Sequence, residues 1–388
     1  MVILLGLIVG FRGTDIFYPG VPIGKLVRAL RRLRSIMPVM RFRVLSAMLA
    51  TSILGGIVLA QSMPVPPKTP DKTRVMTYNI QWFHRGDSLE RVNNLKSVIR
   101  NINPDVIGFQ EIEGKAAIMQ ILDESEWTIG FKDLPDEFQE VGIAVKKPYR
   151  LESYEFVFDT PSLDYPFPGK RDVLKCVVRS PKGVQFVVYV HHMKSRSGGR
   201  MQTDAQRCMA AGMLASYISN QNDKNVVVLG DFNDAPNDRS SNILESGDIL
   251  AKGGVRGEYK LLANLTEDIF EKDYVTIGLH DLYNGQPGVS AKVVGAKAEN
   301  DRLRDRDYRF PQDVKITQTF FDQIFASPSI FARGTDCRVY DGEDAFRGLP
   351  GRVRVMENQQ TGIRSVEYTE NGTLASDHLP VYADITVQ

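Results

Sequence analysis

Cysteine is scarce in this sequence: Cys176, Cys208 and Cys337 are the only three in 388 residues. An odd number cannot all pair within one chain, and their spacing matches no zinc-binding motif. A small disulfide-stabilised scaffold is therefore excluded, and at most one disulfide can form. The hydrophobic share of 43% and the charged share of 24% are those of a globular protein, which excludes a disordered or collagen-like chain.

No charge of one sign dominates either, because the formal net charge is +1. The balance varies along the chain: residues 1–60 carry a net charge of +7 and residues 61–388 a net charge of −6. A mildly acidic body is not typical of a protein that coats nucleic acid. It is compatible with an enzyme that holds phosphates through a metal ion and a few local cations.

Long apolar runs are absent outside the first sixty residues. Residues 44–60 form an uncharged run of seventeen residues that follows the basic Arg41 and Arg43 and ends in Ala60. This pattern predicts an export signal over residues 40–60, with small residues where cleavage occurs. Because the run is close to the minimum length of a membrane span, the alternative is an uncleaved anchor through residues 44–60.

The predicted signal divides the chain into four parts. Residues 1–39 precede it as a leader to which the sequence assigns no role. Residues 61–72 contain four prolines and predict an extended linker. The folded domain is expected to span residues 73–388.

Strand and helix patterns alternate within this domain. Helices are predicted over residues 89–102, after a cap at Ser88, and over residues 205–218. Residues 232–315 show weak apolar periodicity and are predicted to be loops over a binding face. Strands are predicted at 74–80, 105–112, 142–146, 173–179, 184–191, 225–229, 320–326 and 381–387. This order indicates a layered α/β or α+β domain.

Polar residues gather where these strands end. A single Asn or Asp at such a place is more commonly a turn or cap residue. The joint pattern predicts a functional site, because sites are built on the loops at strand ends. The residues concerned are Asn79, Glu111, His192, Asp231, Asn233, Asp377 and His378, together with Asp322 inside an apolar strand.

The same residues carry a family resemblance. The segments TYN, GFQE, YVHHMKS, GDFND, FDQIFAS and SDHLPV, in this order, resemble the signature blocks of the endonuclease/exonuclease/phosphatase superfamily. The resemblance covers residues 73–388 and implies a DNase I-like fold, a four-layer α/β sandwich of two packed, mostly antiparallel β-sheets flanked by helices. It also implies hydrolysis of phosphoesters with a divalent metal, usually Mg²⁺ or Mn²⁺, with Ca²⁺ as a further candidate.

The resemblance implies that four of these residues bind the metal or activate the attacking water. Glu111 is expected to bind the metal, with Asn79 and Asp377 as supporting ligands, direct or through water. Hard oxygen ligands of this kind suit Mg²⁺. Asp231 matches the carboxylate that activates water. Its neighbour Asn233 is expected to donate to a phosphoryl oxygen.

The remaining assignments concern the phosphate. His378 would face it, with Asp322 holding the other ring nitrogen, since an unpaired aspartate is costly inside an apolar strand. His192 resembles a second histidine that contacts the scissile phosphate. Lys194 and Arg207 are candidate phosphate cations, with exposed solvated charges as the alternative.

The substrate is predicted from the same blocks. HxKS and GDFND most resemble secreted bacterial nucleases, so we expect an exported, monomeric endonuclease acting on DNA or RNA, with nucleic acid as its partner and no protein partner evident. The basic residues 194–200 and 302–309 could flank a backbone groove. Gln81, where abasic-site repair enzymes carry an acidic residue, argues against a repair role. A sphingomyelinase-like or other small phosphodiesterase, and a non-catalytic binding protein on the same fold, remain alternatives.

Overall fold

The structure is a computed structural model of the chain. It describes residues 65–134, 137, 139–169, 172–196, 200–272, 274, 276–277, 282–283, 286–287, 320–342, 344–345, 353–357, 364–368 and 375–388. The predicted leader, the export signal or anchor and the basic residues 302–309 lie outside these ranges. Within them, no helix combines the length and apolar character that a membrane crossing requires.

The first sheet has six strands in the order β13-β16-β1-β2-β4-β3. Its central pair, β1 and β2, is parallel, and the other neighbours are antiparallel. The strands are β1 (Thr73–His84), β2 (Val106–Glu113), β3 (Trp127–Phe131), β4 (Glu140–Lys146), β13 (Asp336–Val339) and β16 (Val381–Ile385).

The second sheet also has six strands, in the order β5-β6-β7-β8-β12-β9. Again one central pair, β7 and β8, is parallel and the other neighbours are antiparallel. The strands are β5 (Arg150–Val157), β6 (Val173–Arg179), β7 (Gln185–His192), β8 (Val226–Asp231), β9 (Ala263–Asn264) and β12 (Asp322–Ala326). Two short ladders join β10 (Leu282–Tyr283) to β11 (Gln286–Pro287), and β14 (Val353–Glu357) to β15 (Arg364–Tyr368).

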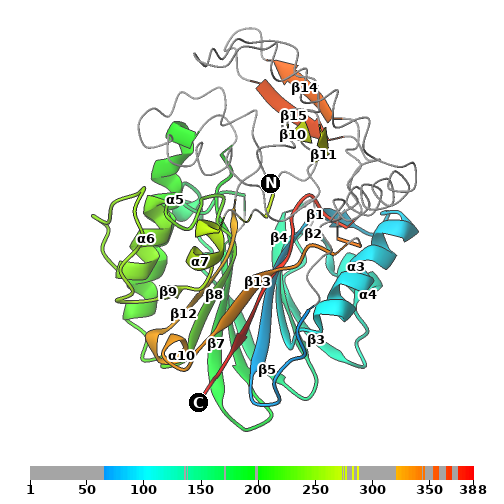
Figure 1. The fold of residues 1–388 in the computed structure, drawn as a ribbon, viewed down its shortest axis with the longest axis horizontal. Helices are drawn as coiled ribbons and strands as arrows, with labels where there is room; N and C mark the ends of the chain where they lie inside the picture. The colour runs from blue at the N-terminus through cyan, green and yellow to red at the C-terminus, as the bar shows by residue number, and fades with distance from the viewer. Residues whose placement is uncertain are drawn as a thin grey trace, which may run out of the picture. The chain divides into compact units, whose positions relative to one another are not determined.

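Helices cover the outer face of each sheet, α3 and α4 on one side and α5 and α6 on the other (Figure 1). Helix α3 begins after Ser88, whose side chain accepts a hydrogen bond from the Arg91 backbone N–H, as the sequence predicts. The helical segments are α3 (Leu89–Ile102), α4 (Lys115–Ile121), η1 (Pro161–Leu163), α5 (Arg200–Ser219), α6 (Arg239–Ser246), α7 (Glu267–Glu271) and α10 (Pro328–Phe331).

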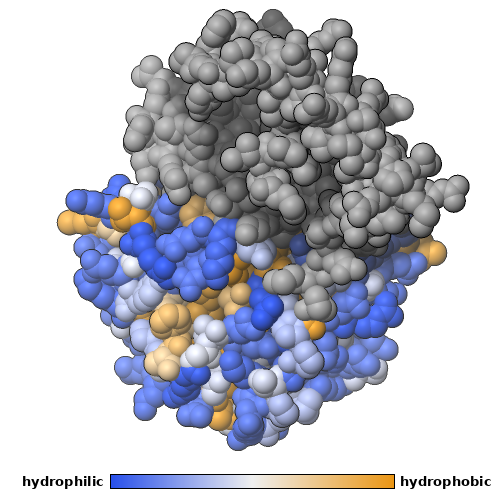
Figure 2. Space-filling view, in the orientation of Figure 1, coloured by the Kyte–Doolittle hydropathy of each residue, from blue (hydrophilic) through white to orange (hydrophobic). Residues whose placement is uncertain are grey.

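Three apolar cores separate the four layers, because alternate residues of a strand point to opposite faces. In β8, Val226 and Val228 pack under α5 and α6. Their neighbours Val227 and Leu229 belong to the core between the two sheets. A third core, which includes Tyr78 of β1, lies between the first sheet and helices α3 and α4. In the view of Figure 2 the described outer surface is mostly hydrophilic, with an apolar area near its middle.

The two sheets approach each other closely at Gly108 of β2. A Cβ atom at this position would lie 2.1 Å from Leu229 Cδ1 of β8 and 3.1 Å from the methyl carbons of Val190 of β7. A side chain here therefore requires the side chains of Leu229 and Val190 on the opposite sheet to move.

The predicted sandwich of two mostly antiparallel sheets between helices is confirmed. The prediction of continuous loop over residues 232–315 is wrong in its first part, where α6, β9 and α7 form and bury residues such as Ile243 and Ala263. Most of residues 278–315 lie outside the described ranges. All three cysteines are free, so no disulfide forms.

Candidate active site

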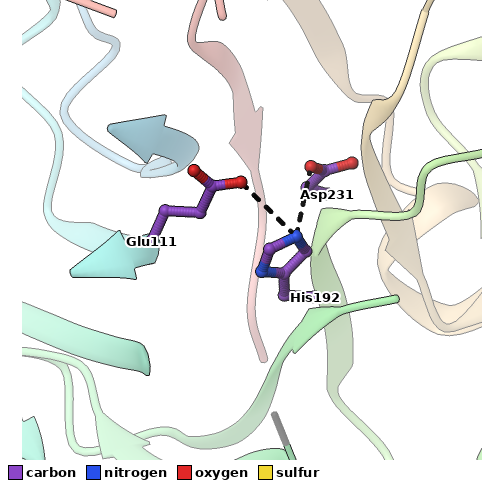
Figure 3. A group of neighbouring side chains, drawn as sticks. All are labelled: Glu111, His192 and Asp231. Atoms are coloured by element: carbon purple, nitrogen blue, oxygen red, sulfur yellow. Dashed lines mark ion pairs between the residues drawn. The ribbon is translucent and has the colours of Figure 1, made fainter. Parts of the chain in front are cut away.

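The parallel strand pair of each sheet brings its carboxyl ends to the same place. Glu111 lies near the end of β2, His192 is the last residue of β7, and Asp231 is the last residue of β8. Their side chains point toward one another (Figure 3). His192 Nε2 lies 3.7 Å from Glu111 Oε1 and 3.6 Å from Asp231 Oδ2. One ligand atom from each residue lies within 4.8 Å of the other two.

Asn79, midway along β1 and directly before its bulge, connects the two carboxylates. Its Nδ2 donates to Glu111 Oε1 and to Asp231 Oδ2, both at 3.0 Å, and its Oδ1 accepts from the Gln81 backbone N–H at 2.9 Å. The amide nitrogen, not the oxygen, thus faces the carboxylates. This orientation makes Asn79 a hydrogen-bonding bridge and does not favour the predicted role as a direct metal ligand.

His378 stands beside this group and is held from behind. Its Nδ1 lies 2.7 Å from Asp322 Oδ2, and its Nε2 lies 3.9 Å from Asp231 Oδ2. Asp322 is the first residue of β12 and is fully buried. Ser376 fixes the loop, because its hydroxyl donates to the Asn79 carbonyl and accepts from the His378 backbone N–H. The contact between His378 and Asp322 that was predicted from the sequence is present.

Asn233 belongs to a tight turn that follows β8. Its backbone φ is +49°, and its N–H donates to Asp231 Oδ1 at 2.9 Å. Its side-chain Nδ2 donates to the Met193 carbonyl at 3.1 Å. In this structure the amide of Asn233 therefore joins the loops after β7 and β8, whereas the sequence predicted a donor to phosphate.

A buried ion pair supports this turn. Asp234 and Arg207 are both fully buried, with Asp234 Oδ2 at 2.8 Å from Arg207 Nε. Arg196 adds a second cation, which lies 3.2 Å from Asp234 and donates to the Asn233 carbonyl at 2.8 Å. Gly230 is required just before Asp231, because a Cβ there would lie 1.8 Å from the His191 carbonyl oxygen.

On the opposite sheet, strand β1 bulges. Asn79 pairs with Gln110 and Phe83 with Ile112, so three residues of β1 lie opposite Glu111 alone. Glu111 itself has a φ of +59°. Backbone irregularities of this kind are common next to active sites, where they direct a side chain.

Burial and crowding shift the protonation of the site. Burial, with the nearby Asp377 second, raises the pKa of Glu111 to about 7. Burial also raises the pKa of Asp231 to about 6, against the opposing effect of His378. Burial lowers the pKa of His378, but the carboxylates of Asp322 and Asp231 outweigh it and hold that pKa well above 6.5.

The donor atoms suit a divalent cation. Burial first, and the neighbouring carboxylate of Asp377 second, disfavour the charged form of Glu111, and a cation beside it would offset both effects. Glu111 and Asp231 offer the oxygens that Mg²⁺ and Mn²⁺ prefer, and His192 adds a nitrogen, a ligand more usual for later transition metals. The residues present therefore fit a metal centre, with His192 and Asp231 closer to it than the sequence suggested.

Of the two predicted phosphate cations, Arg207 occupies another place. The side chain of Arg207 is fully buried against Asp234 and does not reach the protein surface. This contradicts the phosphate contact expected for it and makes it a support of the turn after β8. Lys194 is half-buried, and its carbonyl accepts from Arg207 at 3.1 Å. Asp377 is 9% exposed and lies near enough to Glu111 to influence its charge.

Three supporting residues escaped the sequence analysis: Ser376, Asp234 and Arg91. Ser376 directly precedes the Asp-His pair, and Asp234 closes the GDFND segment, so both stand within predicted motifs. Arg91 lies on α3 and gave no signal, because its contacts with the β1 bulge depend on tertiary packing.

Comparisons with known proteins agree with the motif order. The family model described as "Endonuclease/Exonuclease/phosphatase family" matches residues 76–378. No curated protein sequence matches the chain significantly.

Several solved structures are similar to the chain. Humanized TDP2 of D. rerio is 15% identical, with a TM-score of 0.49 and coverage of 81% of this chain and 99% of that one. The human Nocturnin catalytic domain with bound sulfate is 16% identical, with a TM-score of 0.47 and coverage of 82% and 94%. An endonuclease/exonuclease/phosphatase from Bacteroides vulgatus is 14% identical, with a TM-score of 0.45 and coverage of 82% and 99%.

Proposed function

The chain belongs to the endonuclease/exonuclease/phosphatase family, and from this premise we propose that it is a metal-dependent phosphodiesterase that cleaves nucleic acid. Hydrolysis of phosphoric esters is the chemistry common to the three activities in the family's description. The metal, the nucleic acid and the export of the protein are parts of the proposal.

One observation carries it. Glu111 of the first sheet meets His192 and Asp231 of the second within 4.8 Å, and the His378–Asp322 pair adjoins Asp231. Phosphodiester hydrolysis needs a positioned water, stabilisation of charge on the phosphoryl oxygens and help for the leaving oxygen. Carboxylates, imidazoles and a metal-binding donor set at one place can meet all three needs.

A divalent cation would be held by Glu111 and Asp231, with His192 as the third donor. When bound, it supplies a Lewis acid that polarises the phosphoryl group and acidifies water. Glu111 keeps 14% of its side chain exposed, so the site is open to solvent on that side.

The protein's own groups would order the reacting water and phosphate. Asp231, the last residue of β8, would accept a hydrogen bond and then the proton of the reacting water. Asn79 and the Asn233 N–H fix the direction of its carboxylate. His378, kept charged by Asp322, would stabilise negative charge that develops on the phosphoryl oxygens.

The substrate class rests on the nuclease-like HxKS and GDFND blocks, and the export rests on the apolar residues 44–60. Both stay predictions. A substrate held by its backbone does not require a basic protein, because the metal and His378 supply the local positive charge.

The test is cleavage by the full chain of supercoiled circular DNA, linear DNA, RNA, sphingomyelin and a synthetic phosphodiester. Each is assayed with Mg²⁺, Mn²⁺, Ca²⁺ or Zn²⁺, with and without chelator. We expect chelator-sensitive nicking of circular DNA that falls at least about 100-fold in His378→Ala, given the usual contribution of one catalytic group.

Circular dichroism of His378→Ala controls for misfolding. Turnover of sphingomyelin alone would contradict the nucleic-acid part and leave the metal chemistry standing. Binding of DNA without cleavage in any metal would favour a non-catalytic protein on this fold.

A further inference from the structure

The β1 bulge, which lies opposite Glu111 on β2, carries a large exposed aromatic residue. Trp82 lies in the bulge and is 51% exposed, while Ile80 before it and Phe83 after it are fully buried. An indole in the first sheet would ordinarily point into one of the cores, as Trp127 of β3 does at 5% exposed. The bulge instead turns Trp82 outward.

The strand register places Trp82 beside the metal-binding group. The pairs Asn79–Gln110 and Phe83–Ile112 enclose Glu111 on β2 and residues 80–82 on β1. Neighbouring strands lie about 5 Å apart, so the backbone of the bulge lies within one side-chain length of the Glu111 backbone. Gln81, which precedes Trp82, donates its N–H to Asn79 Oδ1 at 2.9 Å.

The bulge is held in a costly conformation. Gln81 and Trp82 have φ values of +44° and +47°, a region that residues other than glycine rarely adopt. Arg91 holds them there, because its guanidinium donates to the carbonyls of Ile80 and Gln81 at 2.5 and 2.6 Å. The same side chain also donates to the Ala375 carbonyl at 3.1 Å, near His378. Strain of this kind persists where the surroundings fix it, and it clusters at ligand-binding places.

We propose that Trp82 is a stacking platform for a nucleobase next to the scissile phosphate, and that it determines the preference of the site for nucleic acid. This inference rests on the proposed function. A half-exposed indole offers a flat apolar face to a base whose phosphate lies at Glu111 and His378. Stacking on an aromatic ring accepts any base and changes affinity about tenfold.

The chain allows a direct test because it has two tryptophans, Trp82 and Trp127. The full chain with chelator, which prevents cleavage, is titrated with a thymidine oligonucleotide while tryptophan fluorescence is recorded. We expect quenching in the wild type and in Trp127→Phe, and none in Trp82→Phe. Quenching that persists in Trp82→Phe, or quenching of Trp82 by sphingomyelin vesicles and not by the oligonucleotide, would overturn the proposal.

Kinetics with metal separate stacking from structural support. Trp82→Ala should raise KM for the oligonucleotide about tenfold and leave kcat within about twofold, and Trp82→Phe should restore most of the KM. An oligonucleotide that lacks the bases next to the cleaved bond should show no difference between wild type and Trp82→Ala. Tyr154→Ala is the matched control, since Tyr154 is 45% exposed on the edge strand β5.

The two failures are distinguishable. If the wild type cleaves no nucleic acid in any metal, the proposed function is wrong and the stacking inference fails with it. If the wild type cleaves nucleic acid but Trp82→Ala keeps the wild-type KM, the stacking inference alone is wrong.

Discussion

The two sides of the active site are supported in different ways. The side on the first sheet consists of Asn79, Glu111 and the β1 bulge, and it is fixed by Arg91, whose side chain is 13% exposed and pairs with Asp87 at 2.8 Å. The side on the second sheet, which carries His192 and Asp231, is fixed by Arg207 and Asp234. Both of those side chains are completely buried.

This difference indicates that the two sides of the site have different roles. A buried ion pair tolerates little displacement, because separating the charges leaves each of them unsolvated. Such support suits the second sheet, whose Asp231 and Asp322 contact His378 on the segment before β16 of the first sheet. The partly solvated support of the first sheet suits a surface that receives substrate, such as the one that presents Trp82.

The largest expected effect is on catalysis at the second side. Asp322→Asn should lower kcat by about 10²- to 10⁴-fold, because the amide neither fixes the imidazole nor stabilises its charge. The pKa of His378, measured by NMR titration of its ring, should fall toward its ordinary value, since Asp322 is the main group that raises it. An unchanged rate would remove Asp322 from the mechanism and weaken the distinction between the two sides.

The next effect compares the two supports directly. Arg207→Met should lower the free energy of unfolding by about 2–3 kcal/mol, because the buried Asp234 loses its nearest cation and keeps only Arg196 at 3.2 Å and the Ser240 hydroxyl at 2.7 Å. Arg91→Met, in the more solvated support, should cost about 1–2 kcal/mol. Urea denaturation measures both.

A double variant sharpens that comparison. Arg207→Met with Asp234→Leu removes both buried charges and should recover part of the loss. Equal losses in the two single variants would show that burial of the support does not distinguish the sides.

The smallest effect is the pH dependence of stability without metal. Burial raises the pKa of Glu111 from 4.5 to about 7 and that of Asp231 from 3.8 to about 6. An acid with a higher pKa in the folded state holds its proton more tightly there, so stability is greatest at low pH and falls as pH rises from about 4 to about 7. Each unit of difference corresponds to about 1.4 kcal/mol, and the total is of the order of a few kcal/mol.

Matched variants assign this slope to the two sides. Glu111→Gln should flatten it up to about pH 7, and Asp231→Asn should flatten it only up to about pH 6. Mn²⁺ should restore wild-type stability at pH 8 and do less for either variant. Thermal unfolding in chelator and in Mn²⁺ measures the effect, and a slope unchanged in both variants would contradict these pKa shifts.

Local patterns in the sequence predicted the helix and the strands that surround the site. Helix α3 forms over the predicted residues because apolar spacing and the Ser88 cap agree. The strands that carry Glu111, His192 and Asp231 end within two residues of their predicted ends, because each apolar run stops at a polar residue.

The role of Arg207 and the conformation of the β1 bulge depend on tertiary contacts, which local sequence patterns do not reveal. Arg207 occupies a helix that reads as partly exposed, and only its buried partner Asp234, 27 positions away, makes it structural. The bulge at Gln81 and Trp82 gives no local signal either, since neither residue favours a positive φ. Arg91 imposes that conformation from another element.

The close approach of the sheets at Gly108 has a consequence for how the metal-binding residues are spaced. Glu111 stands three residues further along the same strand, and Leu229, which a Cβ at Gly108 would strike, stands two residues before Asp231. Because Gly108 has no side chain, the strands that carry Glu111 and Asp231 can lie close together. Under the proposed function, Gly108 thus helps to determine how far apart the two carboxylates that would hold the cation stand.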